Sequence, residues 1–232
     1  MVSVNKMETV EGKKDTFEAA GSPVSRIKTI AQKRFESSKG SHDWDHTLRV
    51  YRLCEHIGQA EDVDMEVLLI SALLHDIGRA HQDRSNGKMC HAKKGAEIAR
   101  PIIKALPLDK KQKQNILHAI RSHRFRSTCL PKTQEAKVLF DADKLDAIGA
   151  VGVARAYLFA GEVGARLHNP DIDVERVEPY SREDTGFREF KVKLSKIKDR
   201  ILTKEGKKLA EKRHALMDVF FKRFKEEYEG VR

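Results

Sequence analysis

The sequence contains few of the residues that interrupt or cross-link a chain. Of its 232 residues only six are proline and 14 are glycine, and aromatic residues make up 6%. Its three cysteines, Cys54, Cys90 and Cys129, are odd in number and widely separated. This usage argues against both a disulfide framework and a thiolate zinc site, so that a reducing compartment fits best.

Long apolar runs are also missing. The longest, from Val67 to Leu74, is far short of the roughly 20 residues that span a bilayer. The N-terminus lacks the apolar segment of a secretory signal, so we expect a cytoplasmic protein without a membrane partner. Hydrophobic residues at 40% and charged residues at 34% are typical of a globular chain rather than a disordered one.

Positive charge is in excess but unevenly distributed. The net charge is +10, and residues 188–232 hold 15 lysines and arginines against eight acidic residues, whereas 167–187 hold two against six. In the basic part, apolar residues follow helical spacing and predict an amphipathic helix that docks its aromatic stripe on the core. The alternative is that its basic face binds nucleic acid. The stripe consists of Met217, Phe220, Phe221, Phe224 and Tyr228.

Apolar residues recur with the 3.6-residue period of helices almost throughout, and alternating strand patterns are nearly absent. We therefore predict an all-α fold, a single-domain helical bundle. The expected helical segments are 24–38, 44–59, 63–80, 91–106, 109–124, 133–165, 187–203 and 206–229.

The pattern also predicts how the chain is organised. Residues 1–22 are polar without a sustained period, and we expect a flexible arm there. Residues 23–166 would form the core, and 189–232 would form C-terminal helices that pack on it. Between them, 167–188 is the longest irregular stretch, and a loop of that length is usually functional or mobile.

Histidines and aspartates at inward positions are the first sign of chemistry. His46 shares the core-facing stripe of its helix with Val50 and Ile57. Taken alone, such a histidine is more often a hydrogen-bonded core residue. However, the apolar run that ends at Leu74 is followed directly by His75 and Asp76. A carboxylate buried there is costly unless a cation or strong donors compensate it.

A second acidic cluster follows later in the chain, where three aspartates fall within six residues. Asp141 suits a helix cap. Asp143 shares a face with Ala147 and is expected to point inward, and Asp146, one turn away, is a candidate for orienting a metal ligand. Two histidines and two aspartates from three helices would form a mixed nitrogen and oxygen metal site.

This pattern resembles the HD-domain superfamily of metal-dependent phosphohydrolases, whose signature is a histidine, an adjacent His-Asp pair and a distant aspartate. The resemblance covers roughly residues 24–165 and implies that His46, His75, Asp76 and Asp143 bind the metal, with Asp143 rather than Asp141 as the last ligand. The matching runs are His42-Asp43-Trp44-Asp45-His46, Leu73-Leu74-His75-Asp76-Ile77-Gly78-Arg79 and Asp141-Ala142-Asp143-Lys144-Leu145-Asp146.

The resemblance also suggests catalytic roles for Asp76, His91 and His123, because a histidine at the position of His91 often faces substrate or a second metal in this family. The alternative for His123 is a helix-end histidine that satisfies carbonyls. Residues that would bind substrate are Lys144, Arg79 and Arg124. For Lys144 and Arg79 the alternative is that each merely neutralises a neighbouring aspartate.

The function expected from these residues is hydrolysis of a phosphate ester or anhydride of a small molecule, most simply a nucleotide, by metal-activated water. The cofactor would be one divalent ion per chain: manganese, magnesium, iron, cobalt, nickel or zinc. A second ion becomes possible if His91 and His123 also bind metal.

Two alternatives to this function remain at this point. The chain would be a phosphodiesterase for a signalling nucleotide or a nucleic-acid end, or a regulator without catalysis that binds a nucleotide or RNA. The Gly-Tyr-Pro extension of the cyclic-dinucleotide branch is missing after the His-Asp pair. Phe220, Phe221 and Phe224 can either close a monomer or join a homodimer.

Overall fold

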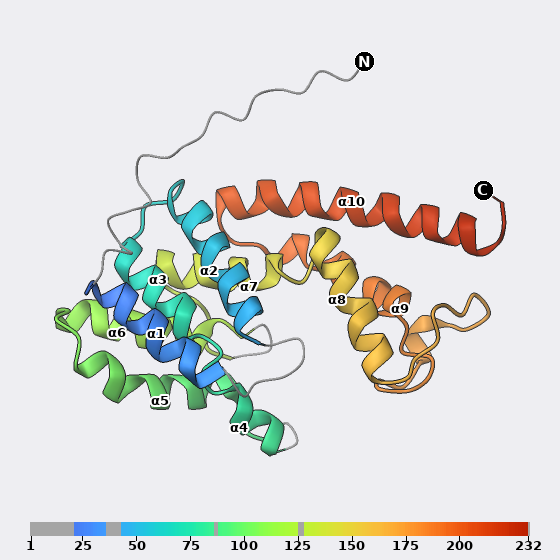
Figure 1. Cartoon of the computed structure of the whole chain (residues 1–232). Coiled ribbons are helices and arrows are strands. Elements are labelled where there is room, and N and C mark those ends of the chain that lie inside the picture. The colour runs from blue at the N-terminus through green and yellow to red at the C-terminus, as the bar shows by residue number, and fades with distance from the viewer. Residues whose placement is uncertain (1–20, 36–42, 86–87, 125–127, 232) are drawn as a thin grey trace.

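The computed structural model describes residues 21–35, 43–85, 88–124 and 128–231, and these form helices with no strand among them (Figure 1). The predicted all-α fold is therefore confirmed. The predicted flexible arm, 1–22, lies almost entirely outside the described residues. Within the described part of the chain, no helix is both long and apolar enough to cross a membrane.

The N-terminal part is a bundle built around a central helix, α3. Every residue of α3 from Val67 to Leu74 is buried, and α1, α2, α6 and α7 all pack on it. This explains why the most apolar run of the sequence occurs there. The helices of this part are α1 (Pro23–Phe35), α2 (Trp44–Gly58), α3 (Met65–Leu74), α4 (Arg79–Arg84), α5 (His91–Lys104), α6 (Lys110–Ser122) and α7 (Gln134–Leu145).

Side-chain caps fix where several of these helices begin. Asp43 accepts a hydrogen bond from the backbone N–H of His46 at 2.9 Å, which places His46 in the first turn of α2. Asp109 and Gln112 form a capping box at the start of α6, and Thr133 caps α7. These caps satisfy N–H groups that have no partner within the helix.

The C-terminal part consists of α8 (Gly149–Glu162), α9 (Gly186–Val192) and α10 (Lys204–Tyr228), with short 3-10 turns between them. Figure 1 shows α10 beginning beside the N-terminal bundle and running past α8 to the C-terminus of the chain. The inward part of the predicted aromatic stripe is confirmed, because Met217 and Phe221 are buried. Phe221 stacks on Phe190 of α9 with 4.2 Å between ring centroids.

The outer part of the stripe is not fully covered. Phe220 and Tyr228 remain 37% and 45% exposed, although both contribute to the aromatic cluster around α8 and α9. The stripe thus docks mainly on the C-terminal helices, through Tyr157, Phe187 and Phe190.

Three predicted helices are interrupted in the structure. The segment predicted over 63–80 ends as α3 at Leu74, and the chain turns before α4. The segment predicted over 133–165 divides into α7 and α8, because Gly149 takes a positive φ of 79° that a helix cannot continue through. The segment predicted over 187–203 is helical only to Val192 and then forms two 3-10 turns.

The predicted capping role of Asp141 is wrong. Asp141 lies inside α7 and is fully buried, so it caps no helix of its own. Its carboxylate instead accepts hydrogen bonds from the backbone N–H groups of Leu202 and Thr203 and from the Thr203 hydroxyl, at 2.7 to 3.1 Å. Asp141 therefore fixes the start of α10 against α7.

Candidate metal centre

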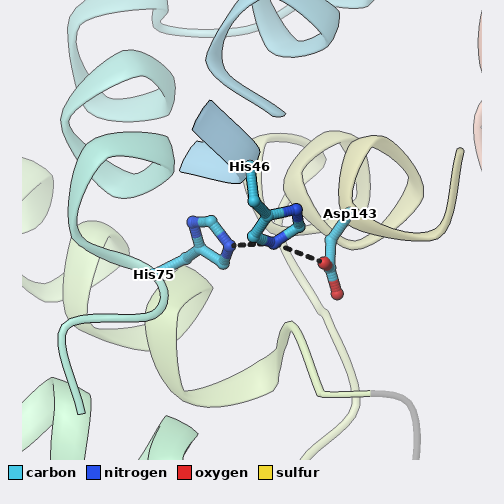
Figure 2. Close-up of side chains that lie close together, drawn as sticks. All are labelled: His46, His75 and Asp143. Carbon is cyan, nitrogen blue, oxygen red and sulfur yellow. Dashed lines mark hydrogen bonds and ion pairs between the residues drawn. The ribbon is translucent and has the colours of Figure 1, made fainter. Parts of the chain in front are cut away.

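The structure brings the four predicted metal ligands together from three helices. His46 comes from the first turn of α2, His75 caps the C-terminal end of α3, Asp76 follows it, and Asp143 comes from α7. Figure 2 shows the two imidazoles and the Asp143 carboxylate pointing towards one another. His46, His75 and Asp76 are at most 1% exposed.

The spacing of their ligand atoms fits a single ion. His46 Nε2 lies 3.3 Å from His75 Nε2, 3.5 Å from Asp143 Oδ1 and 3.8 Å from Asp76 Oδ2, and His75 Nε2 lies 3.9 Å from Asp76 Oδ2. Ligand atoms that each lie about 2.1 Å from one ion are about 3.4 Å apart in a tetrahedron and about 3.0 Å apart at neighbouring octahedral positions, which leave room for water. His46, His75 and Asp143 therefore form one group that could hold a divalent cation, and Asp76, whose other oxygen groups with His91 and His123, lies at its edge.

The orientation of the imidazoles supports this reading. In each of four histidines, Nδ1 is held by an oxygen acceptor, which leaves Nε2 facing the cluster. Because the Nε2 atoms of neighbouring rings lie only 3.1 to 3.3 Å apart, their lone pairs repel unless a proton or cation lies between them. The four Nδ1 bonds are His46 to Asp146 (2.8 Å), His75 to Ala72 O (2.7 Å), His91 to Gln82 (2.8 Å) and His123 to Ile120 O (2.6 Å).

A second group of ligand atoms adjoins the first. Asp76 Oδ1 lies 3.4 Å from His91 Nε2 and 3.5 Å from His123 Nε2, and the three side chains are all buried. Asp76 thus turns one oxygen to the His46 and His75 rings and the other to this second group. The predicted single ion and its two-ion alternative both remain compatible with the arrangement.

Burial keeps two of the rings neutral. Burial lowers the pKa of His75 to about 4, against the opposing charge of Asp76. Burial likewise lowers the pKa of His91 to about 2, again opposed by Asp76 but assisted by the positive charge of Arg79. Neutral imidazole is the form that binds a metal, so both rings are ready to act as ligands.

His46 and Asp143 form a charged pair. Burial opposes a charged His46, but its hydrogen bonds with Asp143 and Asp146 outweigh burial and raise its pKa to about 9. Burial also opposes a charged Asp143, yet the charges of Lys144 and His46 hold its pKa well below the usual value. A cation at this position would take the place of the His46 proton.

The three basic residues predicted to bind substrate differ in their surroundings. Arg79 donates to both oxygens of Asp76 at 3.1 to 3.3 Å and keeps 18% of its side chain exposed. Lys144 donates to Asp143 Oδ2 at 2.6 Å, and its side chain is 9% exposed. Arg124 lies beside the Cys90 thiol. Substrate binding by these residues remains a prediction.

Sequence reasoning missed three residues that hold the side chains around the ligands. Gln82 holds His91, and Arg49 and Arg155 hold Asp146, the residue expected to orient a ligand. A signal existed only for Arg49, which follows His46 by three residues and therefore shares its helix face. Gln82 lies in α4 and Arg155 in α8, and each helix is brought to the site by a turn before it that the periodicity did not reveal.

Comparison with known proteins agrees with this geometry. The family model described as "HD domain" matches residues 43–148, which lie within the predicted core. The uncharacterized protein YpgQ of Bacillus subtilis is 30% identical over 210 residues, which cover 89% of this chain and 94% of YpgQ. Ribonuclease Y of Chloroflexus aurantiacus is 28% identical over 188 residues, but this chain spans only 32% of its length.

Solved structures show the same similarity across nearly the whole chain. An HD-superfamily hydrolase from Bacillus thuringiensis superposes with a TM-score of 0.71 at 26% identity, covering 89% of this chain and 96% of that one. Bacillus subtilis YpgQ, solved in complex with ADP, superposes with a TM-score of 0.67 at 27% identity, covering 88% and 94%.

Proposed function

Since the chain belongs to the HD-domain superfamily, we propose that it is a metal-dependent phosphohydrolase that cleaves a phosphate ester or anhydride of a small molecule, preferably a nucleotide. The observation that carries the proposal is the convergence of the buried His46, His75 and Asp76 with Asp143, whose side chain is 19% exposed. Without a cation, the carboxylate charges and the imidazole lone pairs of these groups would face and repel one another.

The residues present suggest a division of roles. A divalent ion bound there would supply a water of lowered pKa and polarise a phosphoryl oxygen. Asp76 can accept a hydrogen bond from the attacking water. Arg79, which lies 3.4 Å from His91 Nε2, can donate to the phosphate oxygens, whose negative charge grows in the transition state. His91, with its Nδ1 proton held by Gln82, keeps an Nε2 lone pair that can accept a proton or bind a second ion.

Lys144 has a different role in this scheme. Its ammonium is already bonded to Asp143 and to the His123 carbonyl, so it holds the ligand Asp143 in place rather than reaching a substrate. Arg124 lies farther out, beside Cys90, and is the candidate for contact with the leaving group.

The preference for a nucleotide rests on the relatives. YpgQ has been solved with ADP, and the similarity to YpgQ extends over most of both chains. We therefore propose nucleoside di- and triphosphates as the first substrates to test, with manganese among the candidate metals because the mixed imidazole and carboxylate set suits it.

A substrate and metal panel tests the proposal. Nucleoside mono-, di- and triphosphates are incubated with manganese, magnesium, iron, cobalt, nickel or zinc, and the released products are identified by chromatography. We expect turnover with at least one metal and its loss in His46→Ala. Absence of metal binding in the wild-type protein would contradict the proposal and favour a regulator without catalysis.

Similarity to ribonuclease Y supports one competing function, a phosphodiesterase that acts on a nucleic-acid end. Short RNAs labelled at either end, included in the same panel, decide between the two. Cleavage of RNA at a higher kcat/KM than of any mononucleotide would favour the phosphodiesterase.

A further inference from the structure

The Asp146 carboxylate is bound by three side chains from two other helices. Asp146 is 1% exposed at the end of α7. Its oxygens accept hydrogen bonds from His46 Nδ1 at 2.8 Å, from Arg49 Nε at 2.7 Å and from Arg155 Nη1 at 2.6 Å. His46 and Arg49 come from α2, and Arg155 comes from α8.

His46 differs in this respect from the other three histidines of the site. His75 and His123 are held by backbone carbonyls of their own helices, and His91 by a side-chain amide. Of the four, His46 alone has its Nδ1 held by a carboxylate. A carboxylate partner fixes the ring and makes the opposite nitrogen a stronger ligand.

The two arginines explain how this carboxylate can stay charged while buried. An unpaired buried carboxylate takes up a proton, but Arg49 and Arg155 together with His46 satisfy both of its oxygens. Arg155 Nη1 also approaches the Asp146 carbonyl at 3.3 Å, so it fixes the backbone of the α7–α8 corner as well.

We propose that Asp146 is the positioning residue of His46, and that Arg155 of α8 holds Asp146 in place so that the metal affinity of the bundle depends on the docking of α8. This inference rests on the proposed metal-dependent function. It goes beyond it by assigning a role to two residues that touch neither the predicted ion nor the substrate.

Metal affinity is the decisive measurement. Manganese and zinc are titrated calorimetrically into the metal-free wild-type protein and into Asp146→Asn, which keeps the size of the side chain and an oxygen acceptor but removes the charge. We expect binding about 10- to 100-fold weaker in Asp146→Asn. Asp62→Asn, which replaces an exposed aspartate of the loop between α2 and α3, is the matched control and should bind metal as the wild type does.

A second pair of variants tests the role of α8. Arg155→Met should also weaken metal binding, and Arg155→Lys should recover part of the loss. The control is Arg52→Met, which removes an exposed arginine of α2. Thermal melting of each metal-free variant separates loss of affinity from loss of stability.

The outcomes are distinguishable. If the wild type binds metal and Asp146→Asn binds within twofold of it while melting at a lower temperature, Asp146 is only a structural ion pair and the inference fails. If the wild type binds no metal, the proposed function fails and this inference fails with it. If Asp146→Asn binds weakly but Arg155→Met binds normally, the role of Arg155 is overturned.

Discussion

The ammonium of Lys144 joins Asp143 to the backbone of His123: it donates to Asp143 Oδ2 at 2.6 Å and to the His123 carbonyl at 3.0 Å. It also lies 4.7 Å from the Phe140 ring centroid. One side chain thus connects the two groups of ligand atoms, with Asp143 in the first and His123 in the second. A substitution of Lys144 can therefore show whether this side chain has a structural role or binds substrate.

Lys144→Met should destabilise the protein, because it leaves a mostly buried carboxylate and a carbonyl without their donor. We expect a loss of about 1.5–3 kcal/mol in the free energy of unfolding, measured by urea denaturation. Lys94→Met, which removes a partly exposed lysine of α5, is the control and should change little. An unchanged stability with a raised KM would instead show that Lys144 binds substrate.

Removal of metal should lower the melting temperature of the wild-type protein. A ligand that binds only the folded state stabilises it by about 2.7 kcal/mol at 100 times its Kd. Thermal unfolding measured with and without a chelator should therefore show a lower melting temperature of the wild type in the chelator and no change for His46→Ala. An equal shift in both proteins would mean that the metal binds elsewhere.

Replacement by asparagine should lower the stability of the protein at Asp141 and its metal affinity at Asp143. Asp141→Asn places an amide against the N–H groups of Leu202 and Thr203, which should cost about 1–3 kcal/mol of stability while metal binding persists. Asp143→Asn should lose metal affinity. Calorimetric titration of both variants checks the assignment, and loss of metal binding in Asp141→Asn would reverse it.

The inward positions of the candidate ligands could be predicted from local patterns, whereas their assignment as one set, with Asp143 rather than Asp141, followed from the resemblance to the HD-domain superfamily. His46 falls on the apolar stripe of an amphipathic helix, and His75 and Asp76 end the most apolar run of the chain. Such periodicity reports which face of a helix turns inward. It therefore placed these side chains inside the bundle without knowledge of the tertiary structure.

The break between α7 and α8 could not be predicted in the same way. Residues 145 to 148 read Leu-Asp-Ala-Ile and continue the helical period, and besides the positive φ of Gly149 the corner depends on contacts with distant residues. Asp146 is held there by Arg49 and Arg155, and Arg213 of α10 donates to the Leu145 carbonyl. Asp141 was misassigned for the same reason, because its partners at Leu202 and Thr203 lie far along the chain.

Gly78 is the position at which close packing most directly serves the candidate centre. A Cβ atom there would lie 2.3 Å from the His91 carbonyl oxygen and 2.5 Å from the Gly95 backbone nitrogen. Backbone cannot give way as a flexible side chain can, so the turn after Asp76 and the start of α5 would have to separate. Gly78→Ala should therefore cost about 1–3 kcal/mol of stability and weaken metal binding at the second group of ligand atoms by moving His91 away from Asp76.

Gly161 of α8 provides the matched control for this substitution. A Cβ atom there would meet nothing within 4 Å, so Gly161→Ala should be neutral or should stabilise the helix by up to about 1 kcal/mol. Urea denaturation and metal titration of both variants test the argument. If Gly78→Ala were as stable as Gly161→Ala, the turn after Asp76 would have room to relax, and the close approach of His91 to Asp76 would not depend on a glycine at this position.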